Sequence, residues 1–229
     1  MTQRIPFIVA IDGPAGSGKS SLSKLISEKL GWTYLNTGNL YRLIAYLAQK
    51  HSIDFKNEEE LAKLIRQTKD DIVWRKERFF YKGQDVSEDL HSEVIGNQAS
   101  TLAGLPMVRD LLLPIQRTLA LQAPKGVLID GRDIGTVVFP KADLKIFMTA
   151  DLTARAERRY KQLVEKNVQP LPAIKELIEV LRERDRQDAG RAVAPLRRAA
   201  DAIDFDTSSM SIEETAEELY KLIRKNLAV

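Results

Sequence analysis

Short apolar runs alternate with amphipathic stretches along most of the chain. Five such runs have the length and composition of buried strands, at residues 7–11, 33–35, 127–129, 144–148 and 202–205. Between them, apolar residues recur at helical spacing, as they do over 22–30, 108–119 and 212–227. This alternation predicts an α/β fold in which helices cover both faces of a parallel sheet.

Two stretches interrupt the alternation. Residues 70–87 contain two apolar runs on either side of a charged turn, which predicts a small antiparallel ribbon. Residues 152–198 have a helical pattern, with two prolines between the halves of the segment. We expect both stretches to be insertions mounted on the sheet rather than independent domains.

Composition narrows the class of protein. The chain has 229 residues, of which 44% are hydrophobic and 29% charged, a balance typical of globular proteins. It contains no cysteine, which excludes disulfides and thiolate chemistry. No apolar run approaches the length of a membrane span, and residues 1–6 lack the pattern of a signal peptide. We therefore expect a cytoplasmic protein.

The net charge of +3 is too small to predict nucleic-acid binding. Residues 151–198, with 12 basic and 8 acidic side chains, nevertheless carry +4, whereas the rest of the chain carries −1. Such a segment favours a local anion such as phosphate, although a solvated pair of charged helices would give the same pattern.

Residues 13–20 fit the phosphate-loop pattern G-x-x-x-x-G-K-[ST] at every fixed position, between the first strand and the first helix. Glycines let backbone N–H groups approach phosphate oxygens, and the helix N-terminus adds partial positive charge. We expect Lys19 to reach the transferred phosphate and Ser20 to ligate Mg²⁺, with Asp130 holding the metal through water. The predicted ATP-binding set is Gly13, Pro14, Ala15, Gly16, Ser17, Gly18, Lys19, Ser20 and Ser21.

Several classes of protein carry such a loop. The chain has no Asn-Lys pair, so it lacks the guanine-reading motif of GTPases. A small-molecule kinase needs a second anion site, which Arg42, Arg132 and the arginines of 182–191 could form. A kinase for another small acceptor and a nucleic-acid-binding or regulatory ATPase remain as alternatives.

One helical stripe links apolar and charged residues at spacings of 4, 3, 4 and 3: Leu177, Leu181, Arg184, Asp188 and Arg191. We expect its apolar end to pack on the body of the protein and its charged end to cover a polar cleft. The alternative is that Arg184 and Asp188 form an exposed ion pair in water, which would stabilise the helix by only a few tenths of a kcal/mol.

Three blocks make the chain resemble the bacterial cytidylate kinases. They are residues 11–20 with Asn36-Thr37-Gly38 and Tyr41-Arg42, residues 130–140 (Asp-Gly-Arg-Asp-Ile-Gly-Thr-Val-Val-Phe-Pro), and residues 183–196, which include Arg-Ala-Val-Ala-Pro-Leu. The resemblance runs nearly from end to end, and many relatives have Asp where this chain has Asn36, to which we assign no role.

The resemblance implies a P-loop NTPase three-layer fold with a five-stranded parallel sheet, forming one nucleoside monophosphate kinase domain over 1–229. Its core would comprise about 1–36, 104–151 and 199–229. The ribbon would belong to a nucleotide-binding insertion at about 37–103, and a helical lid would span about 152–198.

The implied reaction is ATP-dependent phosphorylation of CMP and dCMP with Mg²⁺ by a monomer that binds neither nucleic acid nor membrane. Lys19, Arg132, Arg184 and Arg191 would be catalytic. Arg42, Arg132 and Arg191 would bind phosphates, and Ser100, Arg109 and Asp133 would face the cytosine. Thr37 would lie near the acceptor, with Arg184 and Asp188 on the lid. Without the resemblance, Arg109 would be taken for an exposed arginine.

Overall fold

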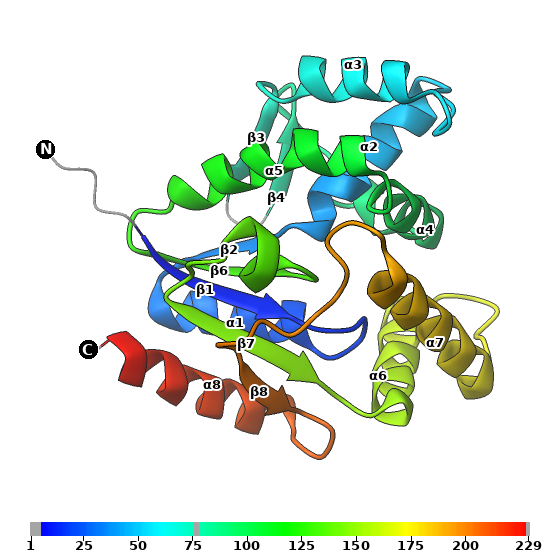
Figure 1. Cartoon of the computed structure of the whole chain (residues 1–229). Helices are drawn as coiled ribbons and strands as arrows, with labels where there is room; N and C mark the ends of the chain where they lie inside the picture. The colour runs from blue at the N-terminus through cyan, green and yellow to red at the C-terminus, as the bar shows by residue number, and fades with distance from the viewer. Residues whose placement is uncertain (1–5, 76–77, 228–229) are drawn as a thin grey trace, which may run out of the picture.

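The structure is a computed structural model that describes residues 6–75 and 78–227 (Figure 1). The middle of the predicted charged turn, at 76–77, and the two chain ends lie outside the described residues. The main sheet is five-stranded and parallel, as predicted, and its strand order is β2-β6-β1-β7-β8. Its strands are β1 (Phe7–Asp12), β2 (Thr33–Asn36), β6 (Gly126–Gly131), β7 (Leu144–Thr149) and β8 (Ile203–Asp206).

Helices cover both faces of this sheet and complete three layers (Figure 1). On one face, Val9 and Ile11 of β1 pack with α1 (Lys19–Leu30) and α8 (Ile212–Leu227). On the other face, Ile8 and Ala10 pack with α5 (Pro106–Leu121) and with a single π-helical turn, Ile134–Val138. The two-residue period of side chains along a strand explains why β1 reads as continuously apolar.

The insertion after β2 has its own hydrophobic core. It comprises α2 (Gly38–Lys50), α3 (Glu58–Thr68), a 3₁₀ turn (Asp89–His91), α4 (Glu93–Leu102) and the antiparallel ribbon β3 (Ile72–Arg75), β4 (Arg78–Tyr81) and β5 (Gln84–Asp85). Leu43, Leu61 and Phe79 pack there together with Leu112 of α5. The predicted ribbon is confirmed, and the insertion shares a core with a helix that covers the sheet.

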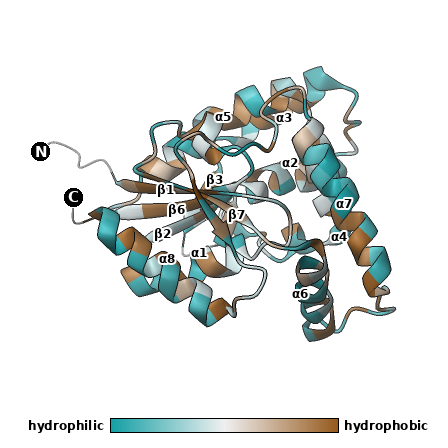
Figure 2. Ribbon diagram, turned by 60° about the horizontal axis from the view of Figure 1, so that its bottom comes forward, coloured by the Kyte–Doolittle hydropathy of each residue, from teal (hydrophilic) through white to brown (hydrophobic). Residues whose placement is uncertain are grey.

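The basic segment forms two packed helices, α6 (Leu152–Glu165) and α7 (Ile174–Gly190), at the edge of the molecule where β7 ends (Figure 1). In Figure 2, α6 is mainly hydrophilic, whereas the central strands are mainly hydrophobic. Leu163 of α6 packs with Leu177 and Leu181 of α7. Within the part of the chain that the structure describes, no helix is long and apolar enough to cross a membrane.

Candidate active site

The phosphate loop joins β1 to α1 in a conformation that its glycines permit. A Cβ on Gly13 would lie 2.0 Å from the carbonyl oxygen of Met148, so no other residue fits there without displacing β7. Gly18 has a left-handed backbone, with φ at 92°, and no side chain caps the helix that follows. The first N–H groups of α1 are therefore directed at the loop, which is the arrangement that binds phosphate.

Lys19 lies folded over this loop. Its ammonium group donates to the carbonyl oxygens of Gly13 at 2.8 Å and Pro14 at 2.7 Å, and to Ser17 Oγ at 3.2 Å. Burial and the charge of Arg132 lower its pKa, while Asp130 and Asp12 oppose that shift. A desolvated cation held by carbonyls at the loop is suited to a phosphate oxygen.

Ser20 and Asp130 meet at the ends of α1 and β6. Ser20 Oγ donates to Asp130 Oδ2 at 2.7 Å, and the Tyr34 hydroxyl donates to the same oxygen at 3.1 Å. The Asn36 amide donates to both hydroxyls, at 3.1 Å to Ser20 and 3.2 Å to Tyr34. Burial raises the pKa of Asp130. Sequence reasoning assigned no role to Asn36 and did not find Tyr34.

These oxygens fit a magnesium ion. The described residues contain no cluster of three or more His, Cys, Asp or Glu that could hold a metal by itself. Magnesium, however, is commonly held by one or two protein oxygens together with substrate phosphates. The hydroxyl of Ser20 and the carboxylate of Asp130 are donors of that kind.

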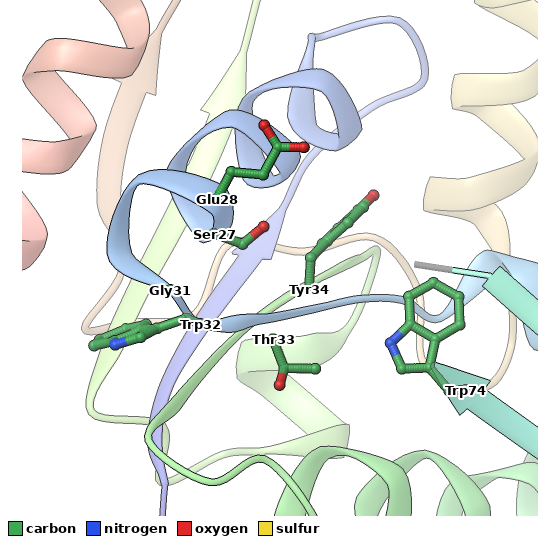
Figure 3. Close-up of a pocket in the computed structure, with 7 residues that line it drawn as sticks. All are labelled: Ser27, Glu28, Gly31, Trp32, Thr33, Tyr34 and Trp74. Atoms are coloured by element: carbon green, nitrogen blue, oxygen red, sulfur yellow. The ribbon is translucent and has the colours of Figure 1, made fainter. Parts of the chain in front are cut away.

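Tyr34 also borders a cavity of about 330 Å³ beside β2, at the edge of the sheet. In Figure 3, Trp32 and Trp74 lie at opposite ends of its lining, with Tyr34 between them. Both tryptophans pack on aromatic rings, Trp32 on Phe7 at 5.7 Å and Trp74 on Phe79 at 4.4 Å between ring centroids. None of the predicted site residues lines this cavity.

The predicted acceptor residues extend from β2 into the insertion. Thr37 Oγ1 donates to the carbonyl of Asp130 at 2.9 Å, which ties the start of α2 to the end of β6. Arg42 donates to the carbonyl of Leu90 at 2.7 Å. A Cβ on Gly96 of α4 would lie 2.8 Å from the Arg42 guanidinium, so this glycine makes room for it. Ser100, half-buried one helical turn later, shares that face of α4.

Arg109 and Asp133 form a buried ion pair, with side chains 8% and 9% exposed. Arg109 also donates to the carbonyl of Ala103 at 3.1 Å and lies 5.8 Å from the Tyr41 ring centroid. Arg109 is thus not the exposed arginine that its local sequence suggests. The pair lines a small cavity of about 40 Å³, to which Ala194 from the segment after α7 contributes.

The stripe on α7 turns its charged half inward. Asp188, 2% exposed, accepts from Arg132 Nε at 2.5 Å and from the Arg191 guanidinium, and α7 continues to Gly190. Burial alone would raise the pKa of Asp188, but the two arginines lower it. The alternative of an exposed Arg184–Asp188 pair is wrong. By contrast, the Arg186 side chain is 79% exposed and pairs with Glu183.

Arg184 lies among other arginines. Its Nε is buried and, within the described part of the chain, has no hydrogen-bond partner. Burial and then the charge of Arg132 lower its pKa to about 10, and Arg42 and Arg159 act in the same direction. Asp188 is the carboxylate that opposes them. An excess of buried cations from separate segments is suited to a ligand with several negative charges.

Two further arginines connect α6 to the rest of the protein. Arg155 donates to the carbonyl of Ala15 in the phosphate loop at 3.0 Å and pairs with Asp185 of α7 at 2.7 Å. Arg159 of α6 pairs with Glu93 of α4 at 2.7 Å. Neither residue could be identified from the sequence, because 152–198 contains many basic residues and no spacing pattern sets these two apart.

Comparison with known proteins identifies a family for the chain. The family model described as cytidylate kinase matches residues 9–225. A cytidylate kinase of Pseudomonas fluorescens is 45% identical over 216 residues, 93% of each chain. That of Stutzerimonas stutzeri is 44% identical over 225 residues, 96% of this chain and 95% of the other. Among solved structures, shikimate kinase from Acinetobacter baumannii covers 98% of the chain at 14% identity and a TM-score of 0.48. On the family match and these identities, the chain belongs to the cytidylate kinase family.

Proposed function

We propose that the chain transfers the γ-phosphoryl group of ATP to CMP and dCMP, giving the diphosphates and ADP. The observation that carries this proposal is the cluster of Arg42, Arg132 and Arg184, in which the Arg184 Nε has no hydrogen-bond partner among the residues that the structure describes. Arg132 lies close enough to Lys19 to lower the pKa of its ammonium group. Cations from the loop and from the cluster can therefore act on one pair of phosphates.

The acceptor is itself a phosphate anion, so the reaction needs no general base. The main barrier is electrostatic, because two polyanions must meet in line, and positioning with charge neutralisation lowers it. Lys19 acts on the donor side and Arg42 and Arg132 on the acceptor side. Arg184 and Arg191 act from the lid, which also excludes water. Ser20 and Asp130 are the residues that would hold Mg²⁺, which would supply positive charge to neutralise the donor phosphates.

The Arg109–Asp133 pair supports recognition of cytosine. Cytosine presents an amino donor at N4 beside ring acceptors, which a carboxylate and a guanidinium complement. Uracil has a carbonyl acceptor where cytosine has that amino group, so it would turn an oxygen toward Asp133. The side chain of Asp133 is 9% exposed, and water there would compensate poorly for the mismatch.

A panel of acceptors tests the proposal. ATP consumption is measured with CMP, dCMP, UMP, AMP and GMP in turn, without an acceptor, and with RNA or DNA. Turnover that requires a cytidine nucleotide is the expected result. Preference for another monophosphate would contradict the assignment of the base, and stimulation only by nucleic acid would favour the alternative of a nucleic-acid-dependent ATPase. A cytoplasmic monomer stays our prediction.

A further inference from the structure

The π-helical turn Ile134–Val138 directly follows two predicted substrate residues, Arg132 and Asp133. It is closed by backbone bonds from the N–H of Val138 to the carbonyl of Asp133 at 3.1 Å and from Phe139 to Ile134 at 2.7 Å. A single helical turn has little stability of its own, and π turns occur frequently at functional sites. The surrounding structure must therefore determine the position of this turn.

Asp12, the last residue of β1, binds the first half of the turn. Its Oδ1 accepts from the N–H of Ile134 and its Oδ2 from the N–H of Gly135, both at 2.8 Å. The residue is 4% exposed, and burial raises the pKa of its carboxyl group to about 6. The two backbone N–H groups oppose this rise, because their hydrogen bonds favour the ionised carboxylate.

Arg117 of α5 binds the second half of the turn from the surface. Its Nε donates to the carbonyl of Val138 at 2.9 Å, and an NH₂ group donates to that of Val137 at 3.1 Å. The turn therefore has a carboxylate at its N–H end and a guanidinium at its carbonyl end, the arrangement that complements a helical dipole.

We propose that Asp12 and Arg117 are positioning residues that hold Arg132 and Asp133 in register with the acceptor nucleotide. This inference rests on the proposed function, in which Arg132 contacts phosphate and Asp133 faces the base. Asp12 also precedes Gly13, so it fixes the base-reading segment relative to the start of the phosphate loop. Neither positioning residue needs to touch the substrate.

Asp12→Asn is the principal variant. Asparagine keeps the size of the side chain but turns an NH₂ donor toward one of the two N–H groups. We expect KM for CMP to rise about tenfold or more, because a charge-assisted hydrogen bond is lost. KM for ATP should rise much less, because Asp12 acts on the phosphate loop only through the charge of Lys19. The melting temperature should fall by a few degrees, because one buried N–H group loses its acceptor.

Arg117→Met tests the other end of the turn without altering a residue next to the phosphate loop. KM for CMP should rise about two- to tenfold without a change in KM for ATP, because Arg117 does not contact the phosphate loop. Arg198→Met is the matched control, because Arg198 is a partly exposed arginine that donates to the carbonyls of Ala199, Ala200 and Ala202 before β8. It should leave both KM values unchanged.

Several results would overturn the inference. They are an unchanged KM for CMP in Asp12→Asn, an equal rise for both substrates, and an Arg117→Met variant that behaves like Arg198→Met. If the wild-type protein does not phosphorylate CMP, the proposed function is wrong. The positioning proposal is then tested separately, by amide hydrogen exchange over residues 131–139 in the free protein. Faster exchange in both variants than in the control supports the anchoring, and unchanged exchange refutes it.

Discussion

Replacing Asp188 of α7 by asparagine tests the electrostatics of the arginine cluster most directly. Asp188 lies between Arg132 and Arg191, with Arg184 close by, and its side chain is 2% exposed. The substitution keeps the shape of the side chain and removes its charge. It therefore leaves a cluster of buried guanidinium groups without the carboxylate that binds two of them.

The expected loss of stability is large for a single substitution. Removing one partner of a buried ion pair typically costs about 3–5 kcal/mol, and we expect about 3 kcal/mol, because asparagine can still accept one hydrogen bond. For a chain of this size, that loss corresponds to a fall of about 10 °C in melting temperature. Asp204→Asn is the control, since Asp204 pairs with Arg198 at 2.7 Å but its side chain is 67% exposed. A pair at the surface contributes little.

The assay is thermal unfolding at pH 7 in low salt, with and without inorganic phosphate. Phosphate should recover more of the melting temperature in Asp188→Asn than in the wild type, because it binds the uncompensated arginines. The arginines lower the pKa of Asp188 below its usual 3.8 despite its burial. Its stabilising contribution is therefore fully present above pH 3.8 and is lost as the pH falls through the lower, folded-state pKa. If Asp188→Asn melts no lower than Asp204→Asn, the reasoning is wrong.

Three further predictions concern activity. Lys19→Ala should abolish turnover while the protein still folds, and near-normal activity with a normal melting curve would contradict the phosphate-loop assignment. Arg109→Met leaves Asp133 without its partner, so initial rates should show KM for CMP rising about tenfold while KM for ATP stays nearly constant. An equal rise in KM for ATP would show that Arg109 does not act in the acceptor site. Arg184→Ala and Arg191→Ala should each lower kcat by about 10²–10³, whereas exposed Arg186→Ala should not, and equal losses in all three would refute the geometry of the stripe.

The features that could be predicted from the sequence are those that a local pattern determines. Buried strands such as β1 and β6 are apolar because both of their faces are covered, and the phosphate loop needs its glycines within eight consecutive residues. The amphipathic spacing on α7 likewise predicts that the face carrying Leu177, Leu181 and Asp188 is buried.

The features that could not be predicted depend on contacts between distant segments. Arg109 has the local sequence of an exposed residue and is buried because Asp133, 24 positions away, neutralises it. Asp12 reaches residues more than a hundred positions away in the chain, and no spacing pattern reports such a contact. The hydrogen bond from the Tyr34 hydroxyl to Asp130 could not be predicted either, because β2 and β6 are neighbours only in the folded sheet.

The strand order has a consequence for the synthesis of the protein. β1 is made first, yet its neighbours in the sheet are β6 and β7, so Phe7 pairs with Gly126 and Val9 with Leu144. At about 5–20 residues per second, a ribosome needs on the order of ten seconds to make the intervening chain. During that time β1 is an apolar strand with two unpaired edges, which exposes the nascent chain to aggregation and to chaperone binding. The insertion, which contains α2, α3 and α4, is synthesised before β6, but its hydrophobic core is incomplete until α5 has been made. A chain interrupted before α5 therefore lacks the sheet partners of β1 and part of the core of the insertion, so it should not form a smaller folded protein.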